Sequence, residues 1–223
     1  AGVPFLAGNA VSERTGKGYL PAYSIIKKGG VKVAVLGYTN AANASLMDAS
    51  CVSGLRFDSL LPLVQEDVDK VRSKEKPQVV IVVAHTSMGK GDGQNLERQG
   101  LDLFNSLKGV DVLVTGHDHS TKVLKTDSTV LLDCGRAGQY ACLADIKLVV
   151  RGGKVISRSL SGEVESFGSE NYDTAMEEAF KSDYEKVRDF NASHVGEVKK
   201  DLVSREFYYR QCDYMNFLHA LAF

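Results

Sequence analysis

The stretches Gln78-Val-Val-Ile-Val-Val-Ala-His85 and Gly109-Val-Asp-Val-Leu-Val-Thr-Gly-His-Asp-His119 decide the fold that we predict for this chain. Each is an apolar run rich in β-branched residues, which is typical of a strand buried in a sheet, and each ends in histidine. The segment between them predicts a helix over residues 95–107, because its leucines suit one inward face. A strand, a helix and a strand in this order form a crossover unit, so the two strands are expected to be parallel.

Further elements are expected on both sides of this unit. Residues 31–37 favour a strand after a Gly-Gly turn, and residues 58–72 favour an amphipathic helix, since their leucine and valine residues recur at helical spacing. A helix is also expected over residues 173–190. Short strands separated by tight glycine turns predict an antiparallel meander over residues 122–124, 130–134, 141–150 and 154–160. The alternation of strands and helices places the chain in the α/β class.

Composition sets outer limits on size and partners. The 223 residues suffice for one domain, or for one domain and part of a second. A net charge of −1 gives no argument for a nucleic acid polymer or an anionic membrane as partner, and no apolar run is long enough to span a bilayer. The four cysteines show neither CxxC pairing nor zinc-ribbon spacing, and Cys134 and Cys142, in apolar strand-like contexts, are expected to be buried thiols.

The histidines at the strand ends are the candidate metal ligands. His85 and His117 follow strands expected to be neighbours, and ligands commonly bind at the carboxyl ends of such strands, so the two imidazoles should lie side by side. His119 is two residues further on, and in an extended loop the Cα atoms of residues 117 and 119 are roughly 6–7 Å apart. That span suits two metal ions about 3.5–4 Å apart. Gly116 is expected to provide the sharp turn after the strand. Asp118 is expected to point away from the metal ions and to orient one of the ligating imidazoles. The alternative is that each histidine is a hydrogen-bonded structural residue.

The order of these segments resembles the calcineurin-like metallophosphoesterases, and within them the bacterial 5′-nucleotidase / 2′,3′-cyclic-nucleotide phosphodiesterase branch. The resemblance rests on residues 31–39, 79–89 and 109–119, with support from residues 5–11 and 130–141. It implies that residues 1–165 are the C-terminal half of the catalytic domain. Residues 166–223 would be a linker helix and the start of the C-terminal nucleotidase domain.

The resemblance implies a partial sandwich of two mixed sheets flanked by helices, from which the N-terminal strands are missing. The parallel sheet would then have an unpaired edge and bare apolar faces. The missing N-terminal half, or a second copy of the chain in a homodimer, would cover them.

By the same resemblance, His85 and His117 would bind one divalent metal ion and His119 a second, with Zn, Mn, Fe or similar metals in the parent protein. The family's other ligands come from an Asp-x-His motif, a bridging aspartate and a Gly-Asn-His motif, whose histidine is catalytic. None of these is found here, since Asn9 is not followed by histidine, so this chain is expected to contain no catalytic residue. A bridging carboxylate neutralises two dications and holds them close. Without it, we expect at most one weakly bound ion and an inactive chain.

In the parent, the expected activity is that of a metal-dependent hydrolase of nucleotide phosphate esters, and the expected location is the periplasm, the cell surface or the exterior. Three alternatives stay open. The substrate could belong to another class, such as sugar sulfates or other phosphate esters. The chain could be a non-catalytic binding or scaffold fragment with vestigial ligands. It could also be an unrelated α/β domain with structural histidines.

Overall fold

The computed structural model describes residues 2–152, 154–168 and 173–222. The chain divides into two compact units, Ala1–Gly168 and Ser169–Phe223. The first contains the sheets and the three candidate ligands His85, His117 and His119, and the second contains two helices.

The first unit is organised around a six-stranded mixed sheet with the strand order β2-β3-β5-β6-β8-β7. Its strands are β2 (Tyr23–Lys28), β3 (Val31–Tyr38), β5 (Val79–His85), β6 (Val112–Gly116), β7 (Thr121–Lys125) and β8 (Val130–Cys134). The four inner strands β3, β5, β6 and β8 pair in parallel. β2 and β7 pair antiparallel at the two ends. The sheet still ends in an edge strand on each side, but these edges are the antiparallel strands β2 and β7, because short turns fold them back alongside β3 and β8.

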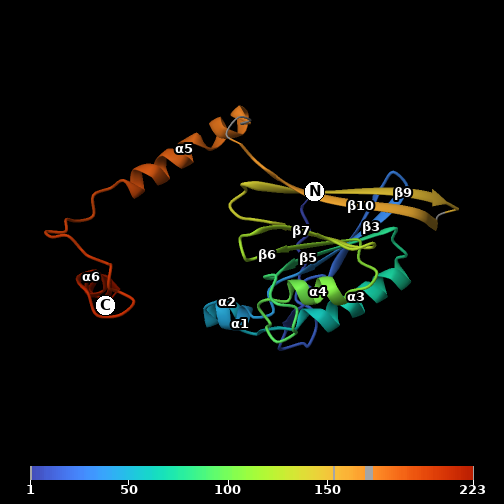
Figure 1. Ribbon diagram of the computed structural model, residues 1–223, viewed down its shortest axis with the longest axis horizontal. Coiled ribbons are helices and arrows are strands. Elements are labelled where there is room, and N and C mark those ends of the chain that lie inside the picture. Colours follow the sequence, from blue (N-terminus) through green and yellow to red (C-terminus); the bar gives the residue numbers. More distant parts are fainter. Residues whose placement is uncertain (1, 153, 169–172, 223) are drawn as a thin grey trace. The chain divides into compact units, whose positions relative to one another are not determined.

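One face of this sheet is covered by helices α3 (Leu60–Lys74) and α4 (Gly100–Ser106) (Figure 1). Leu60, Val64 and Val68 on α3 are fully buried and pack in the same core as Leu36 and Val82 of the sheet. The helical spacing predicts an inward face of Leu61, Val64, Val68 and Val71, and the three valines are buried as expected. Leu61 is only partly buried, and Leu60 is the fully buried leucine. α4 is shorter than expected, because residues 95–99 form a loop before the helix begins at Gly100.

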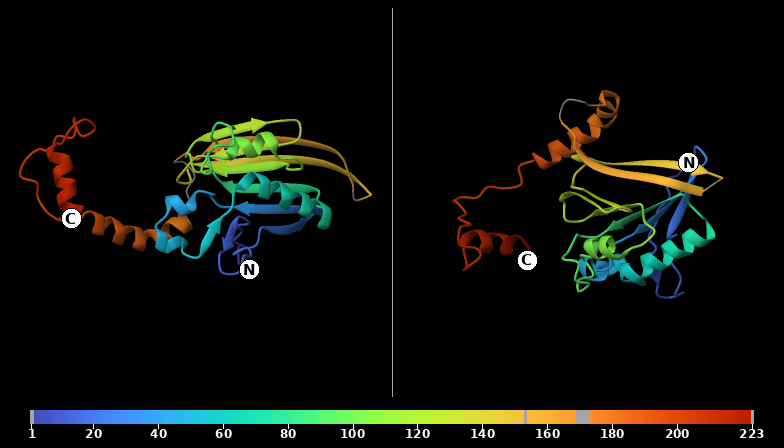
Figure 2. Two further views of the ribbon diagram at one scale, coloured as in Figure 1. Left: turned by 90° about the horizontal axis from the view of Figure 1, so that it is seen from below. Right: turned by 45° about the vertical axis from the view of Figure 1, so that its right-hand side comes forward.

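The opposite face carries a long antiparallel hairpin of β9 (Tyr140–Arg151) and β10 (Lys154–Ser166), which lies across β6 and β8 (Figures 1 and 2). Leu160 of β10 packs there with Val112 and Leu132. Over β5 this face stays partly open, and Val83 is 41% exposed. Val83 is thus an exposed apolar side chain on this face, and the bare apolar face with its cover stays a prediction.

The expected antiparallel meander is confirmed for the pairs β7–β8 and β9–β10, and it is wrong for the pairing of β8 with β9. β8 pairs in parallel with β6 inside the main sheet, and of the four expected strands β9 and β10 lie outside it, in a two-stranded sheet of their own. The reason is burial: Val130, Leu131 and Leu132 are all at most 1% exposed, so β8 must be covered on both faces. The α/β class itself is confirmed, with a mixed sheet flanked by helices as in part of the predicted sandwich.

The remaining elements of the first unit are small. β1 (Ala10–Ser12) pairs with β4 (Leu55–Phe57), and two single-turn helices, α1 (Asn43–Leu46) and α2 (Ala49–Val52), lie between them in the sequence. In the second unit, α5 (Thr174–Asn191) begins after Asp173, whose carboxylate accepts hydrogen bonds from two amides of the first turn. α6 (Asp213–Ala222) follows. Among the described residues, no helix combines the length and the apolar character that a bilayer crossing needs.

A disulfide joins Cys134 at the end of β8 to Cys142 in β9, with 5.6 Å between the Cα atoms. The expectation of two buried thiols is therefore wrong. The sequence placed the two cysteines in separate strands, whereas the connecting loop brings the end of one strand beside the start of the next. Cys51 and Cys212 are free thiols.

Candidate metal centre

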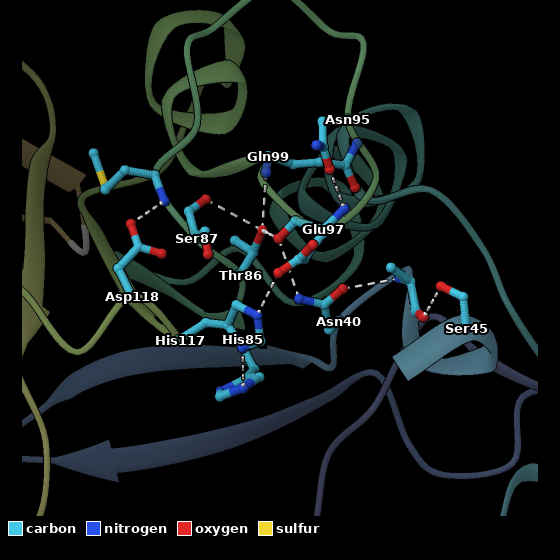
Figure 3. Close-up of polar contacts among 12 residues, drawn as sticks. Asn40, Ser45, His85, Thr86, Ser87, Asn95, Glu97, Gln99, His117 and Asp118 are labelled. Atoms are coloured by element: carbon cyan, nitrogen blue, oxygen red, sulfur yellow. Dashed lines mark hydrogen bonds and ion pairs between the residues drawn. The ribbon is translucent and has the colours of Figure 1, made fainter. Parts of the chain in front are cut away.

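His85 and His117 lie side by side, as the crossover unit predicts. β5 and β6 are parallel neighbours, with His85 paired opposite Gly116 in the register. Nε2 of His85 is 3.1 Å from Nδ1 of His117 (Figure 3). The two rings meet edge to face, with 5.0 Å between centroids and 82° between planes. Two imidazole nitrogens therefore converge at the carboxyl ends of neighbouring strands.

The backbone around these histidines differs from the expected extended loop. His117 has a φ of 129° and His119 a φ of 58°, conformations that non-glycine residues rarely adopt. Gly116, expected to provide the turn, is instead the last residue of β6. The 6–7 Å spacing argument for residues 117 and 119 therefore does not apply. Uncommon backbone conformations of this kind cluster at functional sites.

A carboxylate that the sequence did not point to contacts the histidine pair. Oε1 of Glu97 is 2.9 Å from Nε2 of His117, so the His117 ring lies between His85 and Glu97 (Figure 3). Glu97 is in the loop between β5 and α4, where a helix was expected. No spacing rule links it to either histidine, and we find no signal in the sequence that could have identified it.

Asp118 has a different role from the expected support of an imidazole. Its Oδ2 accepts a hydrogen bond from the Met88 amide at 3.0 Å, which ties the loop after β6 to the loop after β5. Partial burial would raise the pKa of Asp118, but hydrogen bonds from Ser87 and Met88 and the nearby charges of His117 and Arg98 lower it overall. The ionised carboxylate is thus favoured at this point.

His119 lies close enough to His85 to influence it electrostatically. Partial burial, followed by the charges of His117 and His119, lowers the pKa of His85. The neutral imidazole, which is the form that binds metals, is therefore favoured at neutral pH.

The histidine pair fits a divalent metal only as part of a site. Two nitrogen ligands about 2.1 Å from one ion lie roughly 3.0–3.4 Å apart at neighbouring coordination positions, which matches the nitrogen separation of 3.1 Å. Across the described ranges, however, no group of three or more His, Cys, Asp or Glu side chains is arranged to hold an ion. The structure therefore unites His85 and His117 and does not bring His119 into a common ligand set with them.

A cavity of about 790 Å³ opens beside His117 and Asp118. Its lining is mostly polar and includes three basic side chains, Lys90, Arg98 and Lys122. A volume of this order is typical of small-molecule sites.

Asn9 is a structural residue, which supports its exclusion as a ligand. It is fully buried, and its amide nitrogen donates to the carbonyl groups of Thr39 and Asp58. Its amide oxygen accepts from the Thr39 N–H at 2.9 Å, so the side chain is used in joining three segments.

The known proteins that resemble this chain in sequence or structure are nucleotidases, phosphoesterases and related hydrolases. The chain matches no protein-family model. It is 27% identical over 120 residues to a 5′-nucleotidase from Vibrio cholerae, a match that covers 52% of this chain and 22% of that protein. The solved sulfate thiohydrolase SoxB from Thermus thermophilus superposes with a TM-score of 0.68 at 25% identity, covering 83% of this chain and 32% of that one. The calcineurin-like phosphoesterase YfkN from Bacillus subtilis gives a TM-score of 0.71 at 20% identity, covering 86% and 65%.

The fold of the chain is thus similar to part of a calcineurin-like phosphoesterase domain. Several of the curated relatives that the chain matches are 5′-nucleotidases. The chain spans less than a quarter of the length of the Vibrio cholerae relative.

Proposed function

We propose that this chain supplies part of the metal centre of a phosphoric ester hydrolase that acts on nucleotide phosphate esters. In this proposal His85 and His117 hold one divalent ion and His119 contributes to a second. The observation that supports it best is the 3.1 Å approach of the His85 and His117 ring nitrogens at the ends of two parallel strands.

An ion held there would act as a Lewis acid and lower the pKa of a bound water. The residues of this chain would bind the ion through neutral nitrogens and fix the ligand rings. Lys90, Arg98 and Lys122, around the adjoining cavity, would attract the anionic phosphate group. Because the described residues gather only two ligands, we expect one ion to bind weakly, with Zn²⁺ or another borderline metal preferred. The other ligands and the catalytic acid would come from outside these residues, so turnover by this chain alone should be negligible.

The nucleotide substrate is proposed from the 5′-nucleotidase relatives. The cavity beside His117 has the volume of a small-molecule site rather than of a polymer groove. The Cys134–Cys142 disulfide supports a location in the periplasm, at the cell surface or outside the cell, because such bonds persist in oxidising compartments.

Metal binding tests this proposal directly. Equilibrium dialysis of the chain against Zn²⁺ and Mn²⁺, followed by elemental analysis, should show one bound ion. His85→Ala and His117→Ala should each weaken binding by at least about tenfold, since each removes half of the described ligands. His194→Ala is the matched control, because His194 is exposed and lies in the second unit. Equal binding by all four proteins would overturn the assignment of His85 and His117, and the absence of bound metal from the unaltered chain would favour the scaffold alternative.

A second candidate, hydrolysis of sulfate-type esters, is favoured by one observation, the likeness to the sulfate thiohydrolase. Parallel assays of the complete enzyme with p-nitrophenyl phosphate, p-nitrophenyl sulfate and a nucleoside 5′-monophosphate separate the two candidates. The proposal requires phosphate ester turnover that His117→Ala removes. Turnover confined to the sulfate ester would replace nucleotides with the second substrate class.

A further inference from the structure

We propose that Glu97 is a positioning residue that keeps the His117 proton on Nε2, so that Nδ1 is available to bind a metal ion beside His85. This inference rests on the proposed metal-binding function of the histidine pair. It assigns a role to a side chain that neither the sequence motifs nor the predicted ligand set contain.

The hydrogen-bond chemistry of the two contacts determines the tautomer. An ionised carboxylate only accepts hydrogen bonds, so the 2.9 Å contact to Glu97 requires an N–H on Nε2 of His117. A neutral imidazole has one N–H, and Nδ1 therefore presents a lone pair. That lone pair is directed at Nε2 of His85, 3.1 Å away. In the absence of an ion, His85 would donate an Nε2 proton into this contact, and to bind a metal ion through Nε2 it would take the neutral tautomer that has its proton on Nδ1.

The backbone of Glu97 is fixed by buried donors, which makes the contact to His117 more than a chance surface pairing. The Glu97 carbonyl accepts hydrogen bonds from the Ser87 amide at 3.2 Å, the Thr86 hydroxyl at 3.0 Å and the Asn40 side-chain amide at 3.2 Å (Figure 3). Thr86 and Asn40 are 0% exposed. Three donors on one carbonyl hold the residue rigidly, and the carboxylate is presented to His117 from a fixed point.

The neighbouring loop is anchored in the same way. The backbone N–H of Gln99, two residues beyond Glu97, donates a hydrogen bond to the Thr86 hydroxyl at 2.9 Å. On the other side of the ring, Asp118 binds the Met88 amide and so fixes the residue that follows His117. The loop after β5 therefore contacts the loop after β6 on both sides of His117. This arrangement can maintain the uncommon φ of 129° at His117.

A carboxylate on the distal nitrogen of a ligating histidine fixes the ring orientation and raises the basicity of the ligating nitrogen. Loss of such a partner typically lowers metal affinity by about 10–100-fold. Glu97→Gln keeps the shape of the side chain but removes its charge, and its amide can donate to Nε2 and so favour the other tautomer. The variant should therefore change both the tautomer and the affinity.

The test combines histidine nitrogen NMR with Zn²⁺ binding. Long-range proton–nitrogen correlation spectra of the ¹⁵N-labelled chain at pH 8 should show His117 with Nε2 protonated and Nδ1 bare. Glu97→Gln should shift this signature toward the Nδ1-protonated form or a mixture, and lower Zn²⁺ affinity about 10–100-fold. Thr86→Val, which removes one donor from the Glu97 carbonyl but keeps the carboxylate, should act in the same direction more weakly. Glu66→Gln is the control, because Glu66 pairs with Lys70 on the exposed side of α3 and should change neither readout.

The outcomes separate this inference from the proposed function. An Nδ1-protonated His117 in the unaltered chain, or an unchanged tautomer and affinity in Glu97→Gln, overturns the role of Glu97. If the tautomer depends on Glu97 but the unaltered chain binds no Zn²⁺, the positioning of the ring is supported and the metal-binding function fails.

Discussion

A single buried carboxylate, Asp111, connects the two layers that cover the sheet. Its side chain is 1% exposed, and its Oδ2 accepts hydrogen bonds from the Val80 amide at 2.7 Å and from Nη2 of Arg72 at 2.8 Å. Its Oδ1 accepts from Arg158. Arg72 is on α3 and Arg158 on β10, so one residue joins the helical face to the hairpin face. We predict that Asp111→Asn strongly destabilises the first unit.

The expected loss in the free energy of unfolding follows from the hydrogen-bond and ion-pair partners that lose the Asp111 carboxylate. The Val80 amide is buried, and an unsatisfied buried donor costs about 1–3 kcal/mol. Breaking a buried ion pair by removing one partner costs about 3–5 kcal/mol. The arginine side chains are 26% and 34% exposed, so water can replace part of their contacts and the lower end of that range applies. We therefore expect a loss of about 3 kcal/mol, which lowers Tm by roughly 6–12 °C at about 2–4 °C per kcal/mol.

Urea unfolding followed by circular dichroism measures this change as a shift of the midpoint at constant m-value. A double-mutant cycle with Arg158→Ala should give a coupling energy of about 1 kcal/mol or more, because the two side chains are in contact. Asp145→Ala is the control: its pair with Lys147 is exposed on both sides, and the change should stay within about 0.5 kcal/mol. A cost below about 1 kcal/mol for Asp111→Asn, with additive effects in the cycle, would refute the reasoning.

Two further predictions concern the end of β8. The double variant Cys134→Ser/Cys142→Ser should unfold with about 2–3 kcal/mol less stability, since the disulfide closes a short loop; identical denaturation midpoints for the unaltered chain with and without reductant would contradict this. Burial, followed by the charge of Asp118, raises the pKa of Asp133, whose Oδ1 has no hydrogen-bond partner within the described part of the chain. Above the unfolded-state pKa the folded state then binds more protons than the unfolded state, so this group lowers stability as pH rises toward its raised pKa. Asp133→Asn should therefore gain stability relative to the unaltered chain as the pH rises above about 4, the ordinary pKa of an aspartate, and a stability difference that does not change with pH would argue against it.

The sequence by itself determined the local elements and their order. The apolar runs that end in His85 and His117 predicted two buried strands, and the crossover rule made them parallel neighbours, which placed the two imidazoles together. The spacing of Val64, Val68 and Val71 likewise follows the buried face of α3. These features depend on residues close together in the chain, because side-chain periodicity reports directly which face of a strand or helix is buried.

Only the tertiary structure decided which distant groups meet. Glu97 reaches His117 because buried donors, including Asn40 and Thr86, hold a loop that the sequence pattern assigned to a helix. The Cys134–Cys142 disulfide and the parallel pairing of β8 were likewise outside the reach of local patterns. The path of a loop depends on hydrogen bonds to residues far away in the sequence, and neither composition nor periodicity encodes these pairings.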